Sequence, residues 1–75
     1  MEGFFKFLGV SSGTSSKGPY YNVEVHGESG SIRLRCNEDV FNKGMRIQFG
    51  QDVTLHVTLR MYQGSVLVMA DGIEG

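Results

Sequence analysis

The residues that could perform covalent chemistry are few and widely separated in this sequence. The nucleophile candidates are the single cysteine, Cys36, and the serines between residues 11 and 16, and none has a histidine or carboxylate at a diagnostic spacing. The two histidines, His26 and His56, fit no metal-ligand motif. The glycines of residues 9–18 precede a strand pattern and not the helix that a phosphate-binding loop needs. We therefore expect no enzymatic activity, no metal and no other cofactor.

Cations form a more informative pattern. Where apolar and polar residues alternate, an inward apolar face leaves four arginines facing outward: Arg33, Arg35, Arg46 and Arg60. Most of the acidic residues fall instead in predicted turns, a helical connection or the C-terminal tail. A chain with a formal net charge of -1 can therefore present a locally positive sheet face.

Tyrosines and hydrogen-bonding groups are interleaved with these cations. Tyr20 shares a strand face with Asn22, and Tyr62 shares one with Arg60 and His56. A groove for single-stranded nucleic acid needs cations for the phosphates and flat rings for the bases, and stacking is worth about 1–3 kcal/mol per base. The alternative is a solvated sheet face whose arginines and tyrosines only maintain solubility.

The stretch 11–25 is predicted to position the first of these groups. It begins as a polar, glycine-containing loop over residues 11–18 that carries one cation, Lys17, and Pro19 then leads into an alternating strand from Tyr20. Small side chains and backbone N–H groups allow such a loop to lie against a polyanion, and a ring at its edge can stack on a base. A long hairpin connection without any ligand has the same composition.

The rest of the chain alternates in a way that predicts short strands and two hairpins. The predicted strands cover residues 4–10, 20–26, 31–36, 45–49, 53–61 and 65–70. The first has apolar residues on both faces, so we expect it to be covered on both sides, on one of them by a partner subunit. Residues 27–30 and Gln63-Gly64 form the hairpin turns. Cys36 falls on the apolar side of its strand and is expected to be a small buried hydrophobe.

Two further segments are expected to lie outside the strands. Asn37 can cap one to two helical turns that start with two acidic residues and end at Lys43-Gly44. The acidic tail, residues 71–75, is expected to be frayed.

These elements predict a single all-β domain over residues 1–75. The architecture that fits is a small five-stranded antiparallel OB-type barrel with at most one short helical turn, although an SH3-like or Sm-like barrel fits the periodicity equally. A chain of 75 residues is near the lower limit for a single core, so we expect oligomerisation to add buried area. The lone cysteine, and the lack of a signal peptide or of about 20 consecutive apolar residues, favour an intracellular location without membrane contact.

Two segments resemble a known family. Residues 13–20, Gly-Thr-Ser-Ser-Lys-Gly-Pro-Tyr, resemble the loop and strand of the small single-stranded DNA-binding proteins of filamentous bacteriophages, the gene V protein type, which have a similar Ser/Gly/basic run ending in Pro-Tyr. Residues 50–71, with the long alternating strand, a Gln-Gly-Ser turn and an apolar return strand, look like the closing hairpin of that family. The first segment departs from the family in one respect, since Lys17 is its single basic residue.

The resemblance implies an OB-fold, a two-fold homodimer and cooperative, sequence-independent binding of single-stranded DNA. It places this activity in replication of a phage or other mobile element, in the cytoplasm of a bacterial host cell. By position, Lys17 would contact phosphate, Tyr20 would stack on a base, and Tyr62 and Gln63 would lie in a loop that contacts DNA or a neighbouring dimer.

Together with the outward arginines, this gives the predicted nucleic-acid site: Lys17, Tyr20, Arg33, Arg35, Arg60 and Tyr62. A barrel that binds another protein through a sheet edge or the apolar strand 4–8 is the main alternative. RNA is a third possibility, because stacking does not identify the sugar. We expect no small-molecule substrate, and the dimer interface would use the closing hairpin or the first strand.

Overall fold

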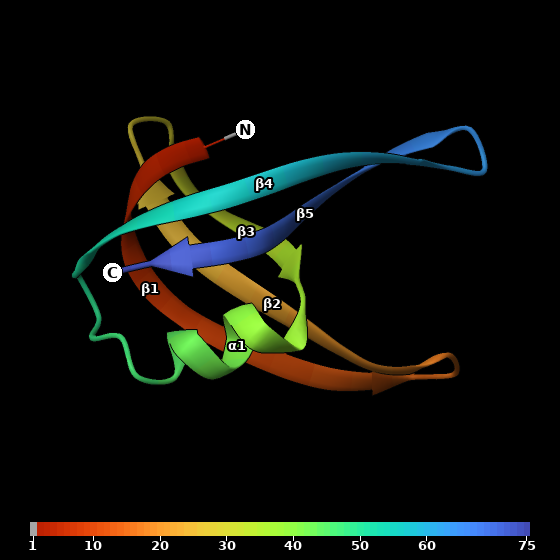
Figure 1. The fold of residues 1–75 in the computed structure, drawn as a ribbon, viewed down its shortest axis with the longest axis horizontal. Helices are drawn as coiled ribbons and strands as arrows, with labels where there is room; N and C mark the ends of the chain where they lie inside the picture. Colours follow the sequence, from red (N-terminus) through yellow and green to blue (C-terminus); the bar gives the residue numbers. More distant parts are fainter. Residues whose placement is uncertain (1) are drawn as a thin grey trace.

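The computed structural model of the protein describes residues 2–75, except for the side chain of Tyr62. The chain forms five strands and one short helix (Figure 1): β1 (Glu2–Ser15), β2 (Gly18–Gly27), β3 (Gly30–Cys36), α1 (Glu38–Gly44), β4 (Asp52–Tyr62) and β5 (Ser65–Glu74). The prediction of a small all-β barrel with one short helix is confirmed.

The strands close into a barrel in the order β1, β2, β3, β5, β4, with β4 pairing back to β1. Neighbouring strands are antiparallel except β3 and β5, which run parallel through the pairs Arg35↔Met69 and Cys36↔Ala70. The prediction of a purely antiparallel barrel is therefore wrong at this seam. The reason is connectivity, because α1 and β4 lie between these two strands in the chain and return β5 in the direction of β3. Five strands in this order, with a helix between the third and fourth, form an OB-type barrel.

The first hairpin is much longer than the sequence predicts. β1 pairs with β2 as far as Ser15↔Gly18, so only Ser16 and Lys17 form the turn. The predicted loop over residues 11–18 is therefore wrong. Serine and glycine are poor strand formers, but Tyr20 and Tyr21 lie opposite Gly13 and Ser12, and such aromatic cross-strand contacts outweigh this propensity.

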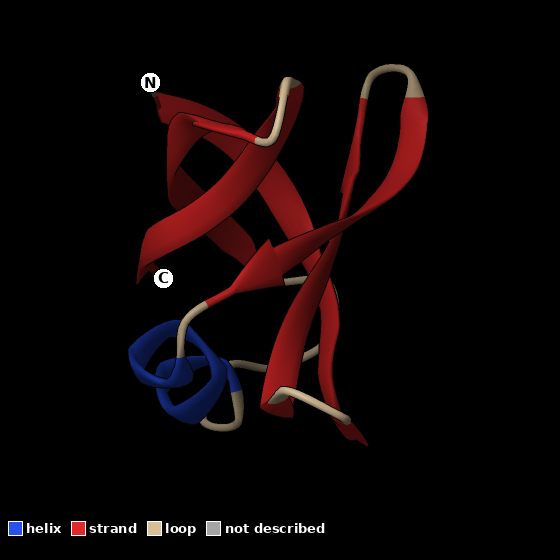
Figure 2. Cartoon of the chain, turned by 90° about the vertical axis from the view of Figure 1, so that its right-hand side faces the viewer, coloured by secondary structure: helices blue, strands red, loops and turns tan. Residues whose placement is uncertain are grey.

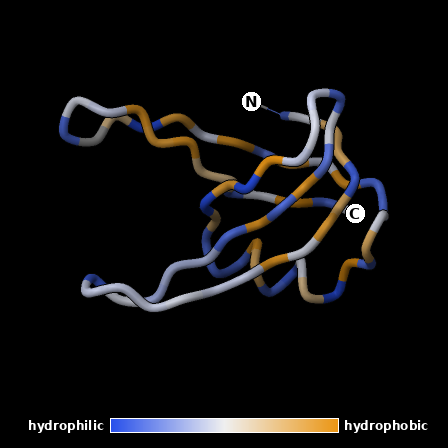
Figure 3. The backbone as a smooth tube through the Cα atoms, turned by 180° about the vertical axis from the view of Figure 1, so that it is seen from behind, coloured by the Kyte–Doolittle hydropathy of each residue, from blue (hydrophilic) through white to orange (hydrophobic). Residues whose placement is uncertain are grey.

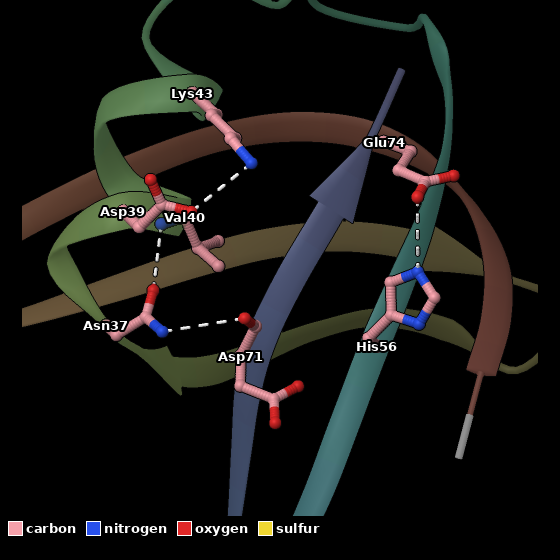
Figure 4. Close-up of polar contacts among 7 residues, drawn as sticks. All are labelled: Asn37, Asp39, Val40, Lys43, His56, Asp71 and Glu74. Atoms are coloured by element: carbon pink, nitrogen blue, oxygen red, sulfur yellow. Dashed lines mark hydrogen bonds and ion pairs between the residues drawn. The ribbon is translucent and has the colours of Figure 1, made fainter.

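The helix begins where the sequence predicts. The Asn37 side chain accepts a hydrogen bond of 2.9 Å from the backbone N–H of Val40, which caps α1 (Figure 4). The Asn37 amide also donates to the carbonyl of Asp71 at 3.5 Å, so the cap ties α1 to β5. Asp39 and Lys43 form an ion pair of 3.3 Å one turn apart on the exposed side.

The segment after α1 is not the strand that was predicted for it. Residues 45–51 continue in turns and bends held by local backbone hydrogen bonds. Arg46 therefore lies off the sheet. The alternating pattern misleads here because Met45 and Phe49 are exposed, and only Ile47 packs against the core.

The closing hairpin turns at Gln63 and Gly64, as predicted, and both residues have positive φ angles, 49° and 81°. β5 then continues to Glu74, beyond the predicted strand. The expectation of a frayed tail is wrong, because Ile73 is only 4% exposed and anchors this end of β5 in the core.

The core fills the barrel and, among the described residues, consists of nine buried apolar residues: Phe7, Val23, Val25, Cys36, Val40, Val53, Leu55, Ala70 and Ile73. The burial predicted for Cys36 is thus confirmed. In the single chain the Phe4 side chain is 77% exposed, so coverage of this side of the first strand by a partner subunit stays a prediction.

Two hairpin arms extend beyond this core: the first arm, residues 11–22 of β1 and β2, and the closing arm, residues 58–69 of β4 and β5. Both project from the same side of the barrel (Figures 1 and 2). Figure 3 shows that the closing arm carries many hydrophobic residues, whereas the first arm is close to neutral in hydropathy. The apolar side of β4 lies in the core only along the first half of the strand. Val53 and Leu55 are buried, but Leu59 and Met61 are exposed, contrary to the inward face that the pattern predicts.

Candidate nucleic-acid interface

One outer face of the barrel connects the two arms. Cross-strand register aligns a row of outward residues over all five strands: Ser11, Asn22, Arg35, Met69 and Thr58. The next pair along these strands, Cys36 and Ala70, is buried in the barrel. Because successive residues of a strand point to opposite faces, the row that contains Arg35 and Met69 faces outward. A ligand chain lying along this row would pass from one arm to the other across β3.

Tyr20 lies flat across the neighbouring strand on this face. It is opposite Gly13, and a Cβ atom placed on Gly13 would be only 2.5 Å from Cζ of Tyr20. The guanidinium carbon of Arg35 lies 4.7 Å from the centroid of the Tyr20 ring. The structure therefore brings two predicted site residues into direct contact, and Gly13 leaves room for the Tyr20 ring on the neighbouring strand.

Arg33 projects from β3 two residues before Arg35 and on the same side, and both side chains are exposed. Their Cα atoms are about 7 Å apart along the strand. Neither arginine forms an ion pair with a carboxylate of the described residues. Glu24, opposite Arg33 on β2, brings an acidic group to the same face.

Arg60 shares the outer face at the other edge. It follows Thr58 by two residues on β4 without an intervening bulge, so it points to the side on which Arg35 lies. Two strand spacings and a two-residue offset along β4 separate these arginines, about 12 Å in a flat sheet. Tyr62 is the last residue of β4, and because its side chain lies outside the described residues, its predicted stacking role stays a prediction.

Lys17 is at the end of the first arm, in the turn that follows Ser15. The Ser15 hydroxyl accepts a hydrogen bond from the Lys17 N–H at 3.3 Å and donates one to the carbonyl of Gly18 at 3.1 Å. At about 3.3 Å per residue, Lys17 is roughly 17 Å along the arm from Asn22. It therefore belongs to the outer end of the face and not to the cluster around Tyr20.

A second acidic group borders the face on β5. Asp71 lies at the bulge where the pairing with β4 shifts, and its carboxylate accepts a hydrogen bond from the Thr58 hydroxyl. The face thus combines three arginines with two carboxylates, Glu24 and Asp71. Positive charge therefore exceeds negative charge on this face only moderately.

Tyr21, unlike Tyr20, belongs to the opposite side of the sheet. Its ring packs against Phe41 of α1 at a centroid distance of 4.9 Å, and its hydroxyl donates to Glu38 at 3.2 Å. Partial burial, followed by the hydrogen bond and the charge of Glu38, raises the pKa of Tyr21. Tyr21 and Phe41 therefore serve the contact between barrel and helix.

Cys36 lies directly beneath this face but not on it. Burial raises the pKa of the thiol to about 11, although the nearby Arg35 acts in the opposite direction. A thiol with this pKa is protonated at neutral pH and is a poor nucleophile.

Sequence reasoning missed two features of the interface. Gly13 matters because it lies under Tyr20, and this pairing can be derived only once the first hairpin is known to extend beyond residue 11. The exposed apolar side of the closing arm was also missed, because an alternating pattern does not reveal where the core ends along a strand.

A cavity of about 460 Å³ lies at the other end of the barrel, between the start of β1, the β2–β3 turn and the start of β4. Phe4, Phe5 and Val53 provide its apolar surface. Lys6 and Asp52 line the cavity as an ion pair of 2.6 Å. None of the described residues of the predicted nucleic-acid site lines this cavity.

No protein-family model matches this chain, and comparisons with curated proteins and with solved structures found no match. Within residues 2–75, no group of three or more histidine, cysteine, aspartate or glutamate side chains is arranged to hold a metal ion. None of the described helices has the length and apolar character needed to cross a membrane.

Proposed function

We propose that this protein binds single-stranded DNA without sequence specificity, in replication of a phage or other mobile element. The observation that carries the proposal is the outer face on which Tyr20, Arg33 and Arg35 are clustered between two projecting arms. The resemblance of residues 13–20 and 50–71 to the gene V protein type supports the same function.

Each group has a defined role in this function. Arg33, Arg35 and Arg60 neutralise phosphates along the face, and Lys17 adds a cation at the end of the first arm. Tyr20 stacks on a base, and Tyr62 would do so from the closing arm. Contacts to phosphates and to the faces of bases carry no sequence information, so binding is sequence-independent. OB-type barrels bind oligonucleotides on the face of their second and third strands and with the β1–β2 and β4–β5 loops, which correspond to this face and these two arms.

The functional unit is a homodimer that associates through the closing arm. The inner side of this arm, defined by Leu59, Met61, Val66 and Val68, has side chains that are 55%, 73%, 62% and 37% exposed. It carries no charged residue, so a two-fold copy can cover it without bringing like charges together. Exposed apolar area of this kind on a small domain typically marks an interaction surface.

The direct test is a titration with oligo-dT at low salt, followed by tyrosine fluorescence and repeated at several salt concentrations. The chain contains no tryptophan, so its three tyrosines report binding directly. We expect quenching that is lost in Tyr20→Ala, weakens as salt rises and is absent with a duplex of the same length. An oligo-U strand in parallel decides between DNA and RNA.

Arg46→Ala provides the matched control, because Arg46 lies off the sheet. Its titration should match that of the unmodified protein, whereas Arg33→Ala should weaken binding. If no strand causes quenching at low salt, the nucleic-acid function is wrong.

A second function is favoured by the cavity at Phe4 and Phe5. Its volume and apolar lining suit one large apolar side chain of a partner protein, and Phe4 is 77% exposed beside it. In that case the barrel is a protein-interaction module. Replacing both Arg33 and Arg35 with alanine would then leave its activity unchanged, whereas Phe4→Ala would abolish partner binding.

A further inference from the structure

The stacking surface of Tyr20 is covered in the free protein. Its ring rests on the backbone of β1 at Gly13, which occupies the side facing the sheet. The guanidinium of Arg35, which projects outward from β3, lies over the ring with its carbon atom 4.7 Å from the ring centroid. Tyr20 is accordingly only partly exposed although it lies on an outer face.

We propose that Arg35 masks Tyr20 until a strand binds, and that binding transfers the guanidinium from the ring to a phosphate. The proposal rests on the proposed function. A base cannot stack on the ring face that the guanidinium of Arg35 covers, so the Arg35 side chain must move for the contact to form.

The exchange is physically favourable. A cation–π contact at an exposed site is weak, and base stacking on an aromatic ring is stronger. Arg35 has no ion pair with a described carboxylate that would hold it in place. Once displaced, its guanidinium remains on the row of residues along which the phosphates pass, where it can bind a phosphate oxygen through two N–H groups.

Arg33, on the same strand, serves as the comparison for the masking role of Arg35. It has the same charge, the same strand and the same outward direction, but it is opposite Glu24 and not over a ring. Arg33 therefore contributes to phosphate binding alone, whereas Arg35 contributes to phosphate binding and also opposes access to Tyr20.

The test uses the full chain with Tyr21→Phe and Tyr62→Phe, so that Tyr20 is the single fluorophore. In the free protein, quenching by the neutral quencher acrylamide should increase about twofold in Arg35→Ala and remain unchanged in Arg33→Ala. Arg35→Lys, which keeps the charge without the planar group, should also increase accessibility.

Titration with oligo-dT over a range of salt then tests the exchange. Each alanine variant should reduce the slope of log K against log salt by about 0.7, the value for one phosphate contact to a single strand. At high salt, where the phosphate contact contributes little, Arg35→Ala should bind more tightly than Arg33→Ala.

Equal acrylamide accessibility in all variants, with binding intact, would overturn the masking role alone. Superimposable titrations of the two alanine variants at every salt concentration would overturn the exchange. Absence of binding by the starting protein would overturn the proposed function and the exchange together, whereas the acrylamide result would still decide whether Tyr20 is masked.

Discussion

Gly13 is the residue on which the position of Tyr20 depends most directly. In Gly13→Ala the new methyl group would lie 2.5 Å from Cζ and 2.9 Å from Cε1 of the ring, distances at which the ring must lift off the sheet. We expect affinity for oligo-dT to fall by about fivefold, which corresponds to about 1 kcal/mol of stacking. The measurement is the fluorescence titration at fixed salt, with thermal denaturation to show that the fold is retained.

Gly9→Ala is the control for this change. Gly9 lies on the same strand and the same outer side, but a Cβ atom there meets nothing within 4 Å. Equal affinities of the two alanine variants would show that the glycine beneath Tyr20 has no role in binding.

The buried thiol of Cys36 is expected to make the folded protein less stable at alkaline pH. Its folded-state pKa of about 11 lies above the ordinary value near 9, so the folded protein keeps the thiol protonated where the unfolded chain loses its proton. The stabilisation is complete below about pH 9 and is lost as pH rises towards 11. We expect the free energy of unfolding, measured in urea, to fall by about 2–3 kcal/mol more than in Cys36→Ala over this interval. Parallel pH profiles of the two proteins would contradict this.

Among the elements, α1 depends on its cap. A helix of seven residues is too short to be stable by itself, and Asn37 both caps it and bonds to β5. Asn37→Ala should therefore lower the free energy of unfolding by about 1 kcal/mol. Asn42→Ala replaces the same residue type at an exposed helical position and should leave stability unchanged or slightly higher. Chemical denaturation of both variants measures the difference, and equal values would exclude a capping role.

Elements with strong local signals are predictable from this sequence. The hairpin of β2 and β3, the cap at Asn37 and the Gln63-Gly64 turn follow from alternation and from turn or cap chemistry, and all three are found. The length of β1 and the non-strand conformation of residues 45–51 do not follow, because both are decided by whether a neighbouring strand is available for pairing.

The arrangement of residues on the outer face is likewise only partly predictable from the sequence. Alternation is sufficient to place Arg33 and Arg35 outward on one strand. It cannot show that β5 lies parallel beside β3, and only that pairing brings Arg60 to the same face. The contact between Arg35 and Tyr20 depends in addition on a glycine in a segment that the sequence presents as a loop.

In the whole molecule, the proposed function gives the two arms different roles. The first arm carries Lys17 and Tyr20 and small side chains, which suits contact with a nucleic acid. The closing arm has Arg60 on its outer side and uncharged apolar residues on its inner side, so one hairpin can face the DNA and a second copy at once. A dimer joined in this way presents two equivalent faces, and a strand long enough to contact both gains affinity through effective concentration.

This arrangement predicts that dimerisation and binding to long strands are lost together. The double substitution of Leu59→Ser and Met61→Ser removes apolar side chains that are 55% and 73% exposed, so it should leave the barrel folded and produce a monomer in sedimentation. Affinity for a long oligo-dT should fall by a factor of about 10² or more, and affinity for a strand that fits one face should not change.

Leu67→Ser alters an apolar residue on the other side of the same arm and should remain a dimer. A dimeric double variant would contradict the closing arm as the interface, and a monomeric variant with full affinity for long strands would contradict the coupling of two faces.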